Sequence, residues 1–340
     1  MLRLPKFELR TPTTLEQAIE WLEEAGPSAL IVAGGTDLVP NMKHELFTPE
    51  LVVSLAGIAE LRGIRRDHDG ALSIGAMTSL EEVAANELVR AQAPALAQAC
   101  SLVAGPQLRS MGTLGGNVML DTRCQWYNQT YFWRQALGFC MKKDGSLCHV
   151  VAGGKNCVAA ASNDSAPALM TLGANLEFES AKGARETPID ELWLADGIRN
   201  KKLEHGEILT RIRVPPVGTG HRGAYGKLRD RGSIDFPLLG VAVRLDLDSA
   251  QRVEHADIVI TALAAQPKRI SKVVETLRGL EVESPEFASA CETVAALAHK
   301  QCRPLPNIPG DHDYRREMVP VYVRRTLAAA AARSGPVHHV

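Results

Sequence analysis

Two glycine-containing stretches, IVAGGTDL (Ile31 to Leu38) and GTLGGN (Gly112 to Asn117), decide how this sequence is read. The first continues an apolar run that predicts a buried strand, and the second also follows apolar residues. Glycine lets the backbone adopt positive φ and approach a ligand closely. Consecutive exposed N–H groups can then hold a phosphate. The two stretches therefore predict two backbone cradles, which could hold the two phosphates of one dinucleotide from opposite sides.

The alternative reading is a pair of tight turns, because neither stretch is a G-x-G-x-x-G or a Walker A motif. Side-chain donors close to the glycines, at Thr36, Thr113 and Asn117, favour the binding role. The candidate binding residues in the two stretches are Ile31, Val32, Ala33, Gly34, Gly35, Thr36, Asp37, Leu38, Gly112, Thr113, Gly115, Gly116 and Asn117.

Around these stretches the patterns predict an α+β fold in three parts, at residues 1–58, 59–215 and 216–335. The first part reads as β-α-β, with Thr13 and Glu16 forming a capping box and Gly26-Pro27 ending the helix. Pro215-Pro216 marks the main boundary. Further strands are expected at 7–9, 29–32, 51–55, 71–74, 174–178, 207–214, 241–247 and 258–260, and helices at 79–85, 94–103, 270–280, from 284 onward and 321–332. The alternating apolar residues of 241–247 predict a half-buried strand.

Composition excludes several classes of protein. The 340 residues carry a net charge of −1, with 45% apolar and 23% charged residues, so no broad basic face for nucleic acid is expected. No apolar run reaches the roughly 18 residues that span a bilayer, and the N-terminus lacks a secretory h-region. We therefore expect a cytoplasmic protein that binds neither nucleic acid nor membrane.

Four of the seven cysteines, Cys124, Cys140, Cys148 and Cys157, fall between the second glycine stretch and Asp164 with the spacing C-x15-C-x7-C-x8-C. Four thiolates suit a [4Fe–4S] cluster or a structural zinc ion, and this spacing is typical of neither. Disulfides would need an oxidising compartment, for which there is no signal. Polar flanks argue against simple buried thiols. The other cysteines, Cys100, Cys291 and Cys302, are expected to be small buried hydrophobic residues.

The segment around these cysteines, residues 121–160, also holds six of the chain's sixteen aromatic residues. These rings could shield a cluster from solvent, or could form the small core that a long insert needs. Five basic residues, Arg123, Arg134, Lys142, Lys143 and Lys155, could offset a cluster's negative charge or could simply be solvated.

The order AGGTDL, GTLGGN, SNDSAPAL and YGKLRDR, spread over nearly the whole chain, resembles the flavoprotein subunits of the xanthine dehydrogenase and carbon monoxide dehydrogenase family. The resemblance implies an FAD-binding N-terminal region of the PCMH type, made of two α/β subdomains, and a C-terminal α+β domain of the carbon monoxide dehydrogenase flavoprotein type. It implies that both glycine stretches contact the FAD pyrophosphate. Asp164 would bind near the ribose or adenine, although it could instead cap a helix before Pro167. Lys227 would lie near the cofactor, although it could be a solvated strand residue.

The insert DTRCQWYNQTYFWRQ, FCMKKDGSLCHV and NCVAA resembles that of the 4-hydroxybenzoyl-CoA reductase β subunits, which carry FAD and a [4Fe–4S] cluster. The resemblance implies the four insert cysteines as ligands. It also implies a hetero-oligomer with a molybdopterin-binding large subunit and a [2Fe–2S] small subunit, ferredoxin as electron donor, and no catalytic residue for substrate in this chain. Comparable inserts occur in some bacterial aldehyde oxidoreductases, so that activity stays open.

Two further alternatives belong to other classes. One is a self-sufficient FAD oxidoreductase with its own substrate pocket. Reduction of its flavin by NAD(P)H would support this alternative. The other is a scaffold with structural zinc. Zinc in the purified chain, without iron or flavin, would support this alternative.

Overall fold

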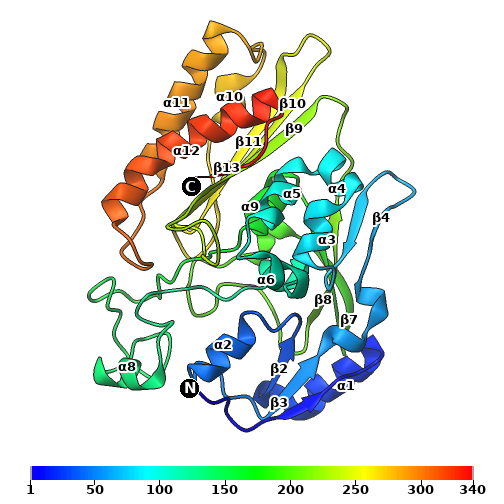
Figure 1. The fold of residues 1–340 in the computed structure, drawn as a ribbon, viewed down its shortest axis with the longest axis vertical. Coiled ribbons are helices and arrows are strands. Elements are labelled where there is room, and N and C mark those ends of the chain that lie inside the picture. Colours follow the sequence, from blue (N-terminus) through cyan, green and yellow to red (C-terminus); the bar gives the residue numbers. More distant parts are fainter. Residues whose placement is uncertain (1, 339–340) are drawn as a thin grey trace.

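The computed structural model describes residues 2–338, which form three sheets in chain order (Figure 1). The first sheet has the order β1-β3-β2, the second β4-β5-β8-β6-β7 and the third β12-β11-β10-β9-β13. The strands are β1 Glu8–Arg10, β2 Ala29–Val32, β3 Leu51–Ser54, β4 Ile64–Arg66, β5 Leu72–Gly75, β6 Asn175–Ser180, β7 Gly183–Pro188, β8 Ile208–Val214, β9 His221–Leu228, β10 Leu239–Leu247, β11 Val253–Thr261, β12 Lys268–Arg269 and β13 Val337–His338.

The first sheet is the parallel β-α-β arrangement that the sequence predicts. Both β1 and β2 pair in parallel with β3, and helix α1 (Leu15–Ala25) connects them. The expected capping box is one residue out of register. Thr14 is the N-cap, and its hydroxyl accepts from the Gln17 amide, while Gln17 Oε1 accepts from the Thr13 amide. The sequence offers two adjacent threonines, and the second of them caps the helix.

The second sheet is antiparallel throughout, and it packs against a group of short helices. The helices whose side chains share one apolar core with the sheet are α3 Leu80–Ala85, α4 Glu87–Gln92, α5 Pro94–Ser101, α7 Leu114–Val118 and α9 Ser165–Thr171. Helix α6 (Pro106–Met111) precedes α7 and has no buried residue. Cys100 belongs to this core and is completely buried, as expected for a small apolar residue. The helices bring the second glycine stretch to the side of the molecule that faces the first sheet.

The third sheet is buried on both faces. Helices α10 (Val273–Leu277), α11 (Pro285–Gln301) and α12 (His312–Ala332) join Val241, Val243 and Ile258 in one core. Ala242 and Val259 point the opposite way, into the core of the second sheet. The alternation of 241–247 therefore does not mark a half-buried strand in its first half, because small apolar residues fill the positions between.

Residues 121–160 leave this framework as an excursion that carries only one helix, α8 (Tyr131–Ala136) (Figure 1). The excursion lies beside helix α2 (Leu38–Lys43), since Arg134 donates hydrogen bonds to the carbonyls of His44 and Glu45. It has its own small core, which includes Leu46 and three of the four cysteines. Within residues 2–338 no helix is both long enough and apolar enough to cross a bilayer.

Candidate functional site

The two glycine stretches lie against each other. A Cβ atom on Gly34 would stand 1.8 Å from the carbonyl oxygen of Met111 and 3.0 Å from Cα of Gly112. A Cβ on Gly112 would in turn lie 3.4 Å from Thr36 Oγ1. Glycine is therefore required at position 34, because any side chain would push the two segments apart.

The first stretch presents free backbone donors. Gly35 adopts φ +72°, which turns the chain between β2 and α2. Among residues 2–338, the amide groups of 34–38 find no protein acceptor, and these residues are not fully buried. Five successive unpaired N–H groups on a turned backbone suit an anionic oxygen ligand such as a phosphate.

The second stretch is not a tight turn, the alternative considered for it, but the beginning of helix α7. Thr113 is the N-cap, and its hydroxyl accepts from the Gly116 amide at 3.0 Å. The amides of Leu114 and Gly115 donate to the carbonyls of Thr78 and Ala76, just after β5. A Cβ on Gly115 would stand 2.7 Å from Ala76 Cβ. This stretch is therefore closely packed and begins a helix, and most of its amide groups already donate hydrogen bonds within the protein.

Asp164 and Lys227 form a buried ion pair. Lys227 Nζ lies 3.1 Å from Asp164 Oδ2 and also donates to the Leu102 and Asp235 carbonyls. The Tyr225 hydroxyl donates to Asp164 Oδ1 at 2.8 Å. Both charged side chains are almost inaccessible, at 3% and 0% exposed. Burial raises the pKa of Asp164, and Lys227 and Tyr225 counteract that rise.

The alternative roles weighed for this pair do not describe it. Asp164 is the residue before helix α9, but its side chain makes no capping hydrogen bond. Lys227 is not solvated. The segment around Asp164 nevertheless meets the second glycine stretch, because Asn117 Oδ1 accepts from the amide and hydroxyl of Ser165. Asn163 Nδ2 donates to the Asn117 carbonyl at 2.7 Å.

Cys124, Cys140, Cys148 and Cys157 come together around one cavity. The cavity volume is about 20 Å³, and the cavity is partly open to solvent. Apolar and aromatic side chains complete the lining, among them Trp126, Tyr127, Met141, Val150 and Ala159. Four cysteines spread over 34 positions of the chain thus line one cavity. Burial raises the pKa of Cys124 to about 12 and also raises that of Cys157, so both thiols are protonated unless a metal displaces the proton.

The basic residues of the insert divide into two groups. Arg134 and Lys142 are buried, with side chains 1% and 4% exposed, and both make ion pairs. Lys143 and Lys155 lie toward solvent. Of the histidines, His149 lines the cavity, and its ring stacks obliquely on Trp126 with centroids 5.3 Å apart.

Arg123 joins the two regions. Its guanidinium donates to Asp37 Oδ1 at 3.0 Å, and its backbone pairs with Ala160. The ring of Phe236 lies 3.8 Å from the guanidinium carbon. One residue therefore connects the first glycine stretch, the segment of Cys124, the segment after Cys157 and the third part of the chain.

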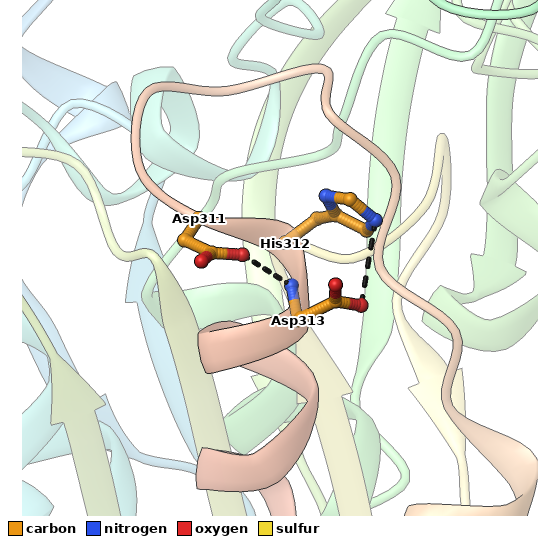
Figure 2. A group of neighbouring side chains, drawn as sticks. All are labelled: Asp311, His312 and Asp313. Atoms are coloured by element: carbon orange, nitrogen blue, oxygen red, sulfur yellow. Dashed lines mark hydrogen bonds and ion pairs between the residues drawn. The ribbon is translucent and has the colours of Figure 1, made fainter.

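A second group of potential metal ligands lies elsewhere, at the start of α12 (Figure 2). Asp311, His312 and Asp313 are exposed, and within residues 2–338 theirs is the only group of three or more His, Cys, Asp or Glu whose ligand atoms all lie within 4.8 Å. Asp311 accepts from the Asp313 amide at 2.8 Å and so caps the helix. Helix capping accounts for this group.

Two residues of these sites escaped the sequence reasoning. Gly197 lies so close to the cavity that a Cβ there would stand 2.7 Å from Cys157 Sγ. No sequence motif predicts this contact. Tyr225 stands two residues before Lys227 on β9, and residues i and i+2 of a strand share a face, so the spacing of these two residues is the signal that could have found it.

Comparisons with known proteins cover the whole of this framework. The family described as "FAD binding domain in molybdopterin dehydrogenase" matches residues 5–217, and the family described as "CO dehydrogenase flavoprotein C-terminal domain" matches residues 223–330. The carbon monoxide dehydrogenase medium chain of Hydrogenophaga pseudoflava is 30% identical, over 97% of this chain and 98% of its own. The aldehyde oxidoreductase FAD-binding subunit of Escherichia coli (strain K12) is 32% identical, over 72% of this chain and 77% of its own. A solved carbon monoxide dehydrogenase structure from Hydrogenophaga pseudoflava superposes with a TM-score of 0.79 at 28% identity, covering 98% of this chain and 100% of that one.

Proposed function

The chain belongs to the family of FAD-binding subunits of molybdenum hydroxylases such as xanthine dehydrogenase and carbon monoxide dehydrogenase, and we propose that it relays electrons through FAD and a [4Fe–4S] cluster held in its insert. FAD exchanges one or two electrons and such a cluster one at a time, so the two together suit a relay. Chemistry on the substrate is assigned to a partner subunit, and no residue of this chain is proposed as catalytic.

The first glycine stretch is proposed to hold the FAD pyrophosphate. The free amides of 34–38 and the turn at Gly35 support this role, since they present donors that the protein does not itself satisfy. Thr113 and Asn117 are proposed to border the pyrophosphate from the second stretch. Asp164 and Lys227 are proposed to act from behind the site, where their ion pair fixes the segment of Ser165, whose amide donates to Asn117.

The convergence of the four cysteines is the observation that carries the cluster. No three of their sulfur atoms lie within 4.8 Å of one another. A tetrahedral zinc ion with Zn–S bonds of about 2.3 Å would hold its sulfurs about 3.8 Å apart. The wider arrangement and the buried cations beside it favour a multi-iron cluster, which carries negative charge on four thiolates. We propose Cys124, Cys140, Cys148 and Cys157 as its ligands.

We infer further that the complex is of the 4-hydroxybenzoyl-CoA reductase type. Two electrons and two protons would remove the para-hydroxyl as water and give benzoyl-CoA, a step of aromatic degradation. The partners on this proposal are a molybdopterin-binding large subunit, a [2Fe–2S] small subunit and ferredoxin as electron donor. The resemblance of the cysteine insert sequence to that of the reductase β subunits supports this assignment. An aldehyde oxidoreductase is the second candidate, favoured by the 32% identity to the FAD-binding subunit of such an enzyme.

A double variant tests the cluster. Cys140→Ser/Cys148→Ser should lose the iron of the anaerobically purified chain and keep its FAD, because the glycine stretches are untouched. Cys291→Ser, at a buried cysteine of α11 far from the cavity in sequence, is the matched control and should keep both. Iron retained in the double variant would overturn the ligand assignment. Identification of the chains that co-purify, with assays for 4-hydroxybenzoyl-CoA and for aldehydes, separates the two candidate complexes.

A further inference from the structure

Lys142 places a buried positive charge at the thiol cavity. It lies between Cys140 and Cys148 in sequence, and it lines the cavity. Its side chain is 4% exposed. The ring of Tyr127, another lining residue, lies 4.7 Å from Nζ. A lysine that only solubilised the insert would extend into water, as Lys155 does.

Every donor of the Lys142 ammonium is used. Nζ donates to Asp121 Oδ1 at 2.8 Å, to the Gly197 carbonyl at 2.7 Å and to the Thr122 hydroxyl. An ammonium group has three N–H bonds, so this set is complete and fixes where the charge stands.

The three partners belong to segments that carry the other cysteines. Asp121 and Thr122 come just before Cys124. The amide of Gly197 donates to the Cys157 carbonyl at 2.8 Å, and Gly197 packs against Cys157 Sγ. Lys142 therefore ties the segments of Cys124, Cys140 and Cys157 together at one point.

The charges around this point do not cancel. The cations are Lys142, Arg123 and the buried Lys201, and the carboxylates are Asp121 and Asp37. Lys142 pairs with Asp121 and Arg123 with Asp37, while Lys201 donates to the Leu120 carbonyl and the Asn200 side chain. Three positive groups against two negative ones leave a surplus of one positive charge on this side of the cavity.

We propose that Lys142 is a positioning residue of the thiol site, and that its fixed charge raises the reduction potential of the cluster held there. This inference rests on the proposed function. One-electron reduction makes a four-thiolate cluster more negative by one charge, and a nearby cation in a poorly hydrated setting favours the more negative form. The same ammonium shapes the site by holding three cysteine segments together.

Two variants of opposite charge effect test the proposal in the full chain, purified anaerobically and titrated with dithionite while the reduced cluster is followed by EPR. Lys142→Met removes the charge and should lower the ratio of reduced to oxidised cluster about tenfold at a given potential, which is a shift of about 59 mV to more negative values. Asp121→Asn removes the opposing charge and should shift the potential the other way. Lys143→Met, at a half-exposed neighbour paired with Asp144, is the control and should leave it unchanged.

Unchanged potentials in both variants with full iron content would overturn the inference and leave the proposed function standing. Shifts of the same sign in both variants would also overturn it. The proposal requires the direction of the shift to depend on the sign of the charge removed, whereas damage to the fold does not. If Lys142→Met fails to retain iron, the sign of the Asp121→Asn shift alone decides. A wild-type chain without iron would overturn the proposed function itself, and this inference with it.

Discussion

Arg123 and Asp37 stand 3.0 Å apart, Nη1 to Oδ1, and this ion pair fastens the segment of the first cysteine to the first glycine stretch. Burial raises the pKa of Asp37 and lowers that of Arg123, and each partner's charge offsets part of that effect on the other. The side chain of Arg123 is 21% exposed and that of Asp37 is 31% exposed, so the pair is neither a surface contact nor a fully buried one. It is the direct connection between the proposed flavin site and the proposed cluster site.

A double-mutant cycle measures this connection. Arg123→Gln, Asp37→Asn and the double variant should show a coupling free energy of about 1 kcal/mol in urea unfolding, the upper part of the range for partly exposed pairs. Each single variant should also retain less FAD, because residue 37 belongs to the stretch of free amides. Additive effects of the two substitutions on both readouts would mean that the pair does not connect the sites.

Gly34→Ala tests the contact between the glycine stretches. The added methyl group would stand 1.8 Å from the Met111 carbonyl oxygen, so the backbone must move apart. We expect loss of bound FAD and a fall of about 2 kcal/mol or more in the free energy of unfolding, typical of overpacking against backbone. Gly218→Ala, where a Cβ meets no atom within 4 Å, is the control and should change neither quantity. Gly116→Val, whose Cβ meets Thr113 Oγ1 at 2.9 Å, should likewise lose flavin.

Lys227→Met leaves Asp164 as an unpaired buried carboxylate. Breaking such a pair costs about 3–5 kcal/mol, and we expect a loss of stability in that range by urea unfolding, with reduced FAD retention. Lys182→Met removes an exposed partner of Glu204, with side chains 80% and 63% exposed, and should change stability little. Equal effects of the two substitutions would contradict the structural role given to Lys227.

The pH dependence of stability should reveal Lys201. Burial lowers its pKa to about 8, whereas an unfolded lysine titrates near 10.4. Between these values the unfolded chain binds the extra proton, so the stability of the folded chain rises with pH across that window. Lys201→Met should be more stable than the wild type below pH 8, and that advantage should shrink by about 3 kcal/mol as the pH passes 10. The exposed neighbour Lys202 provides the control, and Lys202→Met should show no such trend.

The sequence predicts those parts of the fold that depend on local periodicity. The β-α-β order of the first 54 residues follows from apolar spacing, and the family match bears out the two-region fold class. Helix α12 begins nine residues earlier than the expected 321, since Pro320 lies inside it. A proline inside a helix removes a hydrogen bond and usually marks a boundary. Here packing of both halves of α12 against the third sheet retains the helix across it.

Tertiary contacts decide the rest of the site. Helix α7 contains Gly115 and Gly116, and each glycine costs a helix about 1 kcal/mol, so local preference indicated a turn. Close packing on Ala76 and the Thr113 cap make the helix nonetheless. The direction of the Asp164 side chain depends on Tyr225 and Lys227, some sixty residues away on β9. The spacing of the four cysteines gave the group of candidate ligands, but not the approach of Gly197 to Cys157.

The metal content of the wild-type chain tests the central claim most directly. Anaerobic purification followed by elemental analysis, labile sulfide assay and flavin quantification should give about four irons, about four sulfides and one FAD per chain. About one zinc per chain with neither iron nor labile sulfide would contradict the cluster that the four converging thiols are proposed to hold.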